Sequence, residues 1–347
     1  MKVLIGMSGG VDSTVAAYLM QQAGYCCQGA TMELCSAALG CGGSAGTEDA
    51  QKAALKLGIP FHTLDGKKLF QTEVVDAFVK AYESGLTPNP CILCNCHLKF
   101  SYMLREALAL GCELVATGHY ARIRKENDRY LLYKATDSAK DQSYFLAGLT
   151  QQQLAHIQFP LGELTKEQVR KIAREQGFEN AKKQDSQDIC FIPDGDYKAF
   201  LERYTQKTYP TGDFLDLDGN VIGTHNGSIG YTIGQRKGLG IGGMSEPVYV
   251  CRKDTENNTV TVGPDRALFR DALEADNWNW IAFPCPDAPF RAKAKLRSRH
   301  TEQPATVYPG ENGTHRVVFD EPQRAITPGQ TVVIYDGDLV IASGTIK

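Results

Sequence analysis

A glycine-rich turn near the amino terminus constrains the fold of this chain more than any other feature. The turn at 8–13 reads SGGVDS; it directly follows the apolar run 2–6 and directly precedes the helix-like stretch 14–20. A strand that enters a helix through such a turn presents backbone amides and serine hydroxyls to an anion, and glycine lets a polyphosphate approach closely. We therefore predict a phosphate site here, where Asp12 can hold Mg²⁺. A tight turn that uses glycine only for its positive φ is the alternative.

Strand-like and helix-like segments alternate from residue 1 to about residue 200. The strand-like runs lie at 2–6, 28–34, 60–64 and 113–117, and a hairpin follows at 121–134. The helix-like segments lie at 47–57 with Thr47 as N-cap, at 68–82, and at 166–175 between Thr165 and Gly177. This alternation predicts an α/β fold with a doubly wound parallel sheet. Ligands of such sheets bind beyond the carboxyl ends of the strands, where the turn lies.

The pattern changes beyond about residue 204, where short strands are separated by Asp-Gly, Asn-Gly and Gly-Pro turns. We predict an ATP-binding and catalytic domain at 1–203, a small β-rich central domain at 204–270 and a tRNA-binding β-barrel at 271–347, the last role resting on the basic segment and the resemblance described below. A chain of 347 residues is long enough for two or three such cores.

Composition limits the compartment and the class of partner. No apolar stretch approaches the roughly 18 residues that a membrane span needs, and the chain enters its first strand without a leader-like segment. We therefore expect a cytoplasmic protein without a membrane partner, in which the eleven cysteines are not a disulfide framework. The net charge of −3 gives by itself no reason to expect nucleic acid.

Three thiols lie within six residues on a loop stiffened by proline. The segment 87–96 reads TPNPCILCNC and places Cys91, Cys94 and Cys96 before a helix expected near residue 98. A thiol near a helix amino terminus is favoured as the thiolate, so it can act as a nucleophile or as a metal ligand. The chain has no second CxxC to complete a structural zinc site, and Cys190 is the remaining candidate partner.

Basic residues alternate with small or apolar residues over the segment 291–299, which reads RAKAKLRSR. On a strand, the period of two would place all five basic side chains on one face. Such a face is typical of a phosphate-binding stripe for RNA, and a solvated sheet face is the alternative.

Seven motifs carry a family resemblance. The turn at 8–13 lacks the lysine of a Walker loop and resembles the PP-loop of ATP pyrophosphatases, which cleave ATP between the α- and β-phosphates. Over essentially its whole length the chain resembles the bacterial tRNA-specific 2-thiouridylases. The other motifs are TPNP at 87–90, ATGHY at 116–120, KDQSYFL at 140–146, ICFI at 189–192, GQRKGLGI at 234–241 and TPGQ at 327–330.

The resemblance implies an enzyme that uses ATP to replace the C2 oxygen of the wobble uridine in tRNA by sulfur, with AMP as leaving group and the base extruded into a pocket. The implied nucleotide contacts are Gly6, Met7, Ser8, Gly9, Gly10, Val11, Asp12, Ser13, Met32 and Gly118. The implied tRNA contacts are Asn89, Pro90 and Cys91 beside the base, with His119, Lys140, Asp141, Gln142, Arg297, Ser298 and Gln330. Ser298 departs from the Arg-Tyr pair of the family, and His119 also reads as a structural histidine.

The resemblance also implies how sulfur arrives. Cys94 would be the nucleophile or resolving cysteine, and Cys190 would receive a persulfide from a sulfur-carrier protein or a cysteine desulfurase system. Many members carry aspartate where Cys91 stands. Here Cys91, Cys94 and Cys190 could instead hold a [4Fe-4S] cluster that leaves one iron open to bind free sulfide. The persulfide or disulfide route and the cluster route both remain open, and Cys96 is either a spare ligand or an ordinary thiol.

Two other functions fit parts of the pattern. One is another PP-loop ATP pyrophosphatase, a ligase or amidotransferase, although no glutaminase segment is apparent. The other is a non-enzymatic tRNA-binding protein that senses redox state or iron through the same thiols.

Overall fold

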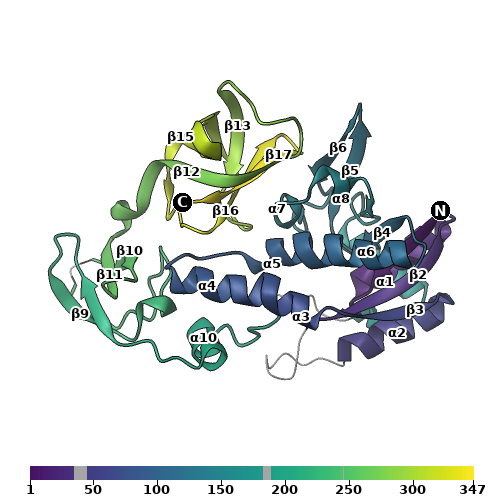
Figure 1. The fold of residues 1–347 in the computed structure, drawn as a ribbon, viewed down its shortest axis with the longest axis horizontal. Helices are drawn as coiled ribbons and strands as arrows, with labels where there is room; N and C mark the ends of the chain where they lie inside the picture. The colour runs from purple at the N-terminus through teal and green to yellow at the C-terminus, as the bar shows by residue number, and fades with distance from the viewer. Residues whose placement is uncertain (35–44, 183–188, 245) are drawn as a thin grey trace.

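The computed structural model of the protein describes residues 1–34, 45–182, 189–244 and 246–347. Its amino-terminal part is built on a five-stranded parallel sheet with the order β3-β2-β1-β4-β7 (Figure 1). The strands are β1 Lys2–Gly6, β2 Cys26–Glu33, β3 Phe61–Asp65, β4 Leu114–Thr117 and β7 Ile157–Gln158. The predicted parallel α/β sheet is thereby confirmed.

Helices cover both faces of this sheet because its central strand is apolar on both sides. Val3 and Ile5 of β1 pack in one cluster with residues of α1 Val11–Gln22 and α2 Ala45–Leu57. Leu4 packs in another cluster with Phe100 and with residues of α6 Met103–Ala109. Helix α9 Lys166–Glu175 begins after Thr165 as expected, whereas Thr47 lies inside α2 instead of capping it.

Two long helical segments run side by side from the sheet toward the centre of the molecule (Figure 1). The first consists of α3 Lys67–Phe70, η2 Gln71–Asp76 and α4 Ala77–Glu83, and the second of α5 Pro90–Leu93, η3 Cys94–Tyr102 and α6. Phe70, Val74, Phe78 and Tyr82 are buried in one cluster, as their spacing of four predicts. An α-helix turns every 3.6 residues or so, and the wider π-helical turn of η2 keeps this stripe on one face.

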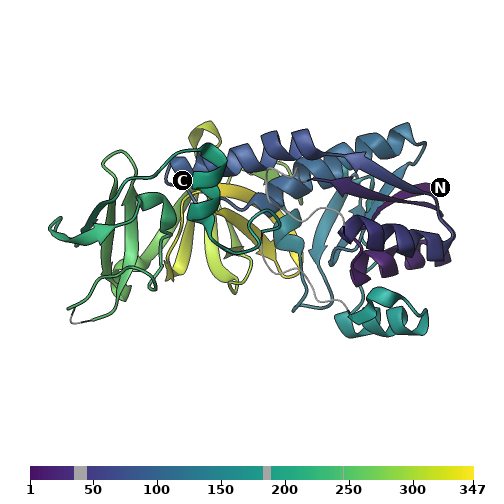
Figure 2. The same cartoon turned by 90° about the horizontal axis from the view of Figure 1, so that it is seen from below.

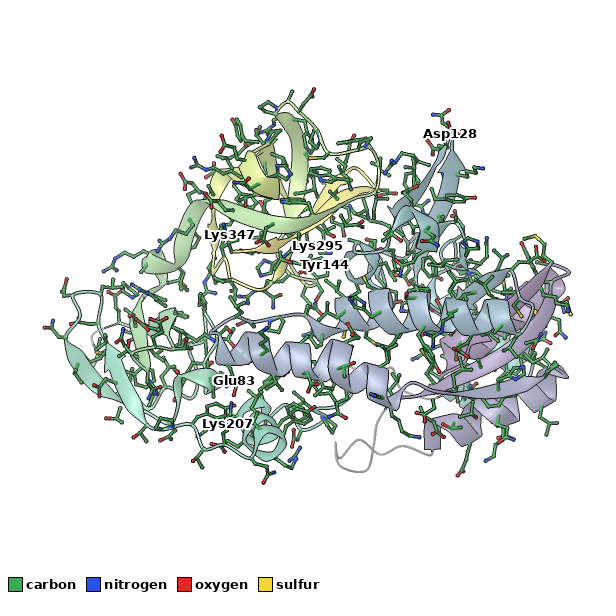
Figure 3. All side chains as sticks on the ribbon, viewed as in Figure 1. Glu83, Asp128, Tyr144, Lys207, Lys295 and Lys347 are labelled. Atoms are coloured by element: carbon green, nitrogen blue, oxygen red, sulfur yellow. The ribbon has the colours of Figure 1, made fainter. Side chains whose placement is uncertain are left out.

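A small β-rich unit lies at the end of the molecule opposite the parallel sheet (Figure 2). After α10 Tyr197–Thr205, its strands are β8 Gly212–Leu215, β9 Val221–His225, β10 Val248–Asp254 and β11 Thr259–Pro264, in the order β10-β11-β8-β9. An ion pair of 2.6 Å between Lys207 and Glu83 ties the chain after α10 to the end of α4 (Figure 3).

The carboxyl-terminal strands close into a barrel through the pairing of β12 with β17. They are β12 Phe269–Trp280, β13 Phe290–Lys295, β14 Gln303–Tyr308, β15 His315–Arg324, β16 Thr331–Asp336 and β17 Leu339–Ile346. The hairpin of β5 Ala121–Glu126 and β6 Arg129–Lys134 joins this sheet where Tyr133 pairs with Leu339. The predicted barrel is confirmed, and its sheet recruits a hairpin from the amino-terminal part.

Among the helices in the described ranges, none is long and apolar enough to cross a membrane.

Candidate active site

The turn between β1 and α1 is held open toward the solvent. The Ser8 N–H donates to Ser13 Oγ at 3.2 Å, and Ser13 Oγ donates to the carbonyl of Gly10 at 3.1 Å. Gly9 has φ +74°, and a Cβ there would lie 2.6 Å from the carbonyl oxygen of Gly46, so only glycine fits. No described side chain caps the first turn of α1, so its amides face outward as an anion site requires.

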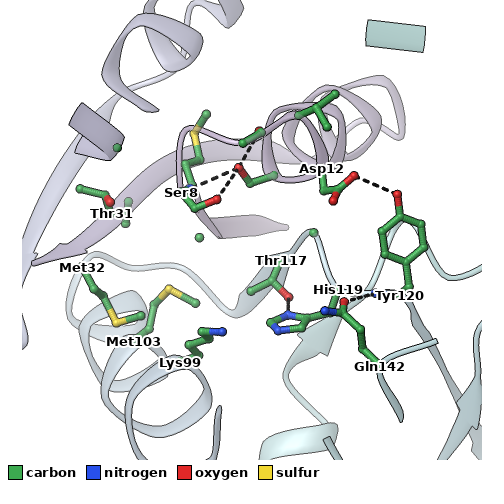
Figure 4. Close-up of a pocket in the computed structure, with 18 of the residues that line it drawn as sticks. Ser8, Asp12, Thr31, Met32, Lys99, Met103, Thr117, His119, Tyr120 and Gln142 are labelled. Carbon is green, nitrogen blue, oxygen red and sulfur yellow. Dashed lines mark hydrogen bonds between the residues drawn. The ribbon is translucent and has the colours of Figure 1, made fainter. Parts of the chain in front are cut away.

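A pocket of about 700 Å³ opens at this turn (Figure 4). The predicted nucleotide residues that line it are Gly6, Met7, Ser8, Gly10, Val11, Asp12, Ser13, Met32 and Gly118; Gly9 is not among the lining residues. The predicted tRNA residues His119, Lys140 and Gln142 line the same pocket. The structure thus brings together predicted residues from four segments that are distant in the sequence: 6–13, 32, 118–119 and 140–142.

Gly118 allows the end of β4 to approach the turn. A Cβ at Gly118 would lie 2.7 Å from the carbonyl carbon of Asp12 and 2.7 Å from the nitrogen of Ser13. Those contacts are with backbone atoms that cannot swing aside. The glycine is therefore required by the shape of the pocket floor.

The carboxylate of Asp12 has two partners within the protein. Lys166 Nζ lies 2.8 Å from each of its oxygens, and the Tyr120 hydroxyl donates to Oδ1 at 2.9 Å (Figure 4). Mg²⁺ at nucleotide sites is typically held by one or two carboxylates together with phosphate oxygens and water. The two oxygens of a carboxylate offer about four acceptor positions, so Asp12 remains a suitable ligand of this kind beside Lys166 and Tyr120.

His119 is held in an apolar setting. Its Nδ1 lies 2.8 Å from Thr117 Oγ1, and its ring packs against Phe100 and Phe159 at centroid distances of 5.6 and 5.9 Å. Burial, and secondly the charge of Lys99, hold the pKa of His119 well below its usual value. The ring is neutral at physiological pH, so it can stack or hydrogen-bond but carries no charge to a phosphate.

The three residues 140–142 differ in whether they line the pocket or make hydrogen bonds within the protein. Lys140 and Gln142 line the pocket, and Gln142 Oε1 accepts from the Tyr120 N–H at 2.9 Å. Asp141 accepts from the N–H groups of Ala135 and Ser143 and from the Ser143 hydroxyl, at 3.0, 3.2 and 2.8 Å. Asp141 therefore orders the start of α7 Ser143–Leu146.

The cysteine loop begins at a helix cap. Asn89 Oδ1 accepts from the Cys91 N–H at 3.2 Å, and Pro90 occupies the first position of α5. Cys91 is exposed, whereas Cys94 is 8% exposed and packs in the same apolar cluster as Phe191, the residue after Cys190. The chain thereby brings the Cys190 segment against the cysteine loop.

The thiols of Cys91, Cys94 and Cys190 influence one another. Burial, and after it the charges of Cys94 and Cys91, raise the pKa of Cys190 to about 11, and Lys99 acts in the opposite direction. Burial also raises the pKa of Cys91 and of Cys94, and Lys99 again lowers both. All three are free thiols, and Cys190 is exposed at the surface despite the desolvation of its sulfur.

These thiols do not fit a cluster as they are arranged here. Within the described ranges, no group of three or more His, Cys, Asp or Glu side chains is placed to hold a metal ion. Cys96 packs with the core beside Gly148, and burial followed by Cys94 raises its pKa to about 12.

The predicted basic stripe is wrong as a single face. Strand β13 ends at Lys295, and Arg297 lies beyond it, half-buried, donating to the Ala325 carbonyl at 3.1 Å and to Thr327 Oγ1 at 2.6 Å. Arg291 pairs with Asp320 at 2.7 Å. The alternation correctly indicates a strand, but the guanidinium groups of Arg291 and Arg297 are paired with other residues of the barrel.

Gln330 also has an internal partner. Its amide donates to the Thr87 carbonyl at 2.6 Å, and the Thr87 N–H donates to the Pro328 carbonyl at 2.9 Å. The TPGQ turn of the barrel thus holds the loop that leads to the cysteines. Ser298 is half-exposed beside Arg297.

Several functional candidates carry no motif signal. Lys99, Thr31 and Met103 line the pocket, and Lys166 reaches Asp12 from α9. Lys99 stands five residues after Cys94 in η3, where the π-helical turn brings residues at that spacing closer in direction than an α-helix does. Cys26 and Cys285 sit in or beside apolar segments of the sequence, yet both thiols are exposed.

Three family models match consecutive parts of the chain. They are described as a tRNA methyl transferase HUP domain at 1–194, a tRNA methyl transferase PRC-barrel domain at 198–264 and an aminomethyltransferase beta-barrel domain at 270–346. These ranges follow the sheet domain, the small β-rich unit and the barrel of the structure.

Curated relatives match the chain along its whole length. The chain is 47% identical to a protein of Acetivibrio thermocellus named tRNA-specific 2-thiouridylase MnmA, and the match covers 100% of this chain and 99% of that protein. Proteins of the same name from Clostridioides difficile and Clostridium acetobutylicum are 45% and 44% identical, over 100% of this chain and 98% and 99% of theirs.

Proposed function

The chain belongs to the tRNA-specific 2-thiouridylase family, and from this premise we propose how its residues carry out ATP-dependent thiolation of tRNA. It is a tRNA sulfurtransferase, and we assign it the wobble uridine as substrate. One observation supports the assignment of the site most strongly. Lys99 lines the nucleotide pocket and also acts electrostatically on Cys91, Cys94 and Cys190, so the pocket and the thiols are neighbours.

In the first step the uridine is activated. The pyrophosphate part of ATP binds the amides of the 8–13 turn, with the adenine toward Met32 and Gly118. The uridine O2 attacks the α-phosphorus, and pyrophosphate leaves. Mg²⁺ bound at Asp12 would neutralise charge on the leaving pyrophosphate. The C2 oxygen, a poor leaving group by itself, can then depart with AMP.

In the second step sulfur is delivered. Cys190 is exposed and can receive a persulfide from a sulfur-carrier protein or a cysteine desulfurase system. The terminal sulfur attacks C2, AMP leaves, and the base is joined to Cys190 through a disulfide. Cys94 then attacks Cys190 Sγ, which forms a Cys94–Cys190 disulfide and releases 2-thiouridine. A two-electron thiol reductant restores both cysteines.

A [4Fe-4S] cluster on Cys91, Cys94 and Cys190 is the second candidate for sulfur delivery. It is motivated by Cys91, which stands where many relatives carry aspartate. The placement of the thiols favours the persulfide route instead, since the described residues hold no group of three or more His, Cys, Asp or Glu side chains suited to a metal ion.

The test is a thiolation assay on unmodified tRNA after anaerobic purification, with a persulfide donor or sulfide supplied. Cys94→Ser and Cys190→Ser are each expected to abolish thiolation, and Cys91→Ser is expected to retain it. Activity that survives either of the first two changes contradicts the assignment. Loss of both activity and a visible iron chromophore in Cys91→Ser would establish the cluster route.

The same assay separates the rival functions. AMP and pyrophosphate formation that is independent of tRNA would indicate a ligase or amidotransferase acting on another acceptor. A complete lack of ATP turnover with tRNA and a sulfur source present would indicate a binding protein that senses redox state.

A further inference from the structure

A cysteine and a histidine of the barrel lie side by side outside the nucleotide pocket. Cys285 Sγ is 3.5 Å from Nε2 of His315, the first residue of β15. Cys285 lies between two prolines in the segment that joins β12 to β13, and it is exposed, whereas only 3% of His315 is exposed. Neither residue is among those that line the nucleotide pocket. The pair is therefore a second place where a nucleophilic side chain meets a polar partner.

The hydrogen bonds of His315 determine which ring nitrogen carries the proton. The Gly310 N–H donates to His315 Nδ1 at 3.2 Å, so Nδ1 must offer a lone pair. Burial lowers the pKa of His315, so the ring is neutral near pH 7 and its one proton is on Nε2. The Nε2–H therefore donates to Cys285 Sγ.

Two tryptophans hold the imidazole in this orientation. The rings of Trp278 and Trp280 stack on each other with centroids 5.3 Å apart, and each meets the His315 ring edge to face at 5.4 Å. A rotation that turned Nε2 away from the sulfur would disrupt these ring contacts and the hydrogen bond from Gly310. The donor on Cys285 is therefore pre-organised.

This arrangement gives Cys285 the two properties of a reactive thiol. The thiolate is the nucleophilic form of cysteine, and a fixed N–H donor stabilises negative charge on the sulfur. Exposure gives a dissolved reagent access to that sulfur. Cys26 is the matched comparison, because it is also exposed and no histidine among the described residues donates to its sulfur.

We propose that Cys285 is a modification site that exchanges with disulfides of small thiols while His315 donates to its sulfur. The Cys285 thiolate attacks one sulfur of the small disulfide, a bond forms between these two sulfurs, and the original disulfide bond breaks. The other half leaves as a thiolate and takes up a proton from water, which replaces the proton that Cys285 lost. The small disulfide is itself the oxidant. This inference goes beyond tRNA thiolation and does not depend on it.

The experiment exposes the full chain to oxidised glutathione near pH 7 and follows each cysteine by peptide mass spectrometry. Cys285 is expected to form the mixed disulfide roughly tenfold faster than Cys26. His315→Phe keeps an aromatic ring beside the tryptophans but removes the donor, so the rate at Cys285 should fall to within about threefold of the rate at Cys26. The control is His300→Phe, an exposed histidine of the barrel, which should leave the rate at Cys285 unchanged.

Two results would overturn the inference. One is a wild-type protein in which Cys285 reacts no faster than Cys26, and the other is an unchanged rate at Cys285 in His315→Phe. If His315→Phe does not fold, His315→Asn replaces it, because its amide oxygen can accept from the Gly310 N–H while its shorter side chain does not reach the sulfur. The same loss of rate is expected there, and an unchanged rate again excludes a role for His315.

Tryptophan fluorescence provides an independent measurement, since Trp278 and Trp280 are the only tryptophans of the chain. Their emission should change in step with the modification of Cys285 and stay constant in Cys285→Ser under the same conditions. Constant emission during modification of the wild-type protein would place the sulfur away from the His315 ring contacts and would contradict the proposed site.

Discussion

At the scale of single residues, Lys99 connects the two halves of the chemistry. The three thiols at the site are desolvated, which raises their pKa values, and Lys99 is the group that lowers all three. The same side chain lines the nucleotide pocket, so it can also face the phosphate of an adenylated base. The proposed mechanism therefore gives this one cation two roles, in the reactivity of the sulfur and in the departure of AMP.

Replacing Lys99 by methionine should make Cys94 less reactive. Removal of a nearby positive charge disfavours the thiolate, so the pKa of Cys94 rises and its alkylation by iodoacetamide at pH 8 should slow roughly threefold to tenfold. Peptide mass spectrometry follows the modification of each cysteine separately. Lys99→Arg keeps the charge and is the matched control. Identical alkylation profiles for Lys99→Met and the wild type would show that Lys99 does not influence the pKa of Cys94.

The pH dependence of Cys190 follows from its burial. Desolvation disfavours the charged thiolate and raises the pKa to about 11, from an ordinary value of 9.0. Below the pKa the thiolate fraction grows about tenfold for each pH unit, so alkylation of Cys190 should still be rising steeply between pH 9 and 10. In urea-unfolded protein, the alkylation rate of the same cysteine should level off once the pH passes the ordinary pKa of 9.0. A plateau below pH 9 in the folded protein would contradict this placement of Cys190.

At the scale of elements, motifs contained in one short segment predicted the local structure well. Contacts between residues far apart in the sequence could not be predicted. The strand, turn and helix around 8–13 are encoded within twenty residues, so the phosphate-site geometry could be anticipated. The contribution of Lys166 to the site could not be predicted, because its ion-pair partner Asp12 lies far away in the sequence. For the basic segment at 291–299, the sequence predicted a single basic face that the structure does not form over the whole segment. Its alternation is real, but where β13 ends and which acceptors Arg297 meets depend on tertiary structure.

The contact between the end of β4 and the start of α1 is a prediction at this scale. Gly118→Ala places a Cβ about one ångström too close to the backbone of Asp12 and Ser13, so the two elements must separate. We expect a loss of stability of about 1–3 kcal/mol, seen by thermal unfolding, and a loss of measurable ATP binding. Gly242→Ala, whose added Cβ meets nothing within 4 Å, is the control. Normal ATP affinity in Gly118→Ala would show that the pocket floor is not built as described.

At the scale of the whole molecule, the barrel is joined to the catalytic loop by hydrogen bonds. Tyr144 of α7 donates to the Thr331 carbonyl at 2.8 Å, and Ser343 of β17 donates to the Ala147 carbonyl at 2.9 Å. The TPGQ turn holds Thr87 in the same way. A polynucleotide that binds the barrel can therefore influence the cysteine loop through the protein backbone, without touching either cysteine.

Gln330→Ala tests this connection. The change removes the hydrogen bond to the Thr87 carbonyl, worth about 0.5–1.5 kcal/mol, so the loop at 86–91 should open roughly threefold to tenfold more often. Hydrogen exchange of that loop and alkylation of Cys91 should both accelerate, while ATP affinity stays unchanged, because Gln330 does not line the nucleotide pocket. Gln323→Ala, whose amide donates to Glu321 in its own strand, is the control. Weaker tRNA binding with unaltered hydrogen exchange would instead indicate that Gln330 contacts tRNA directly, as the sequence resemblance implies. It would also show that the Gln330–Thr87 hydrogen bond does not stabilise the loop.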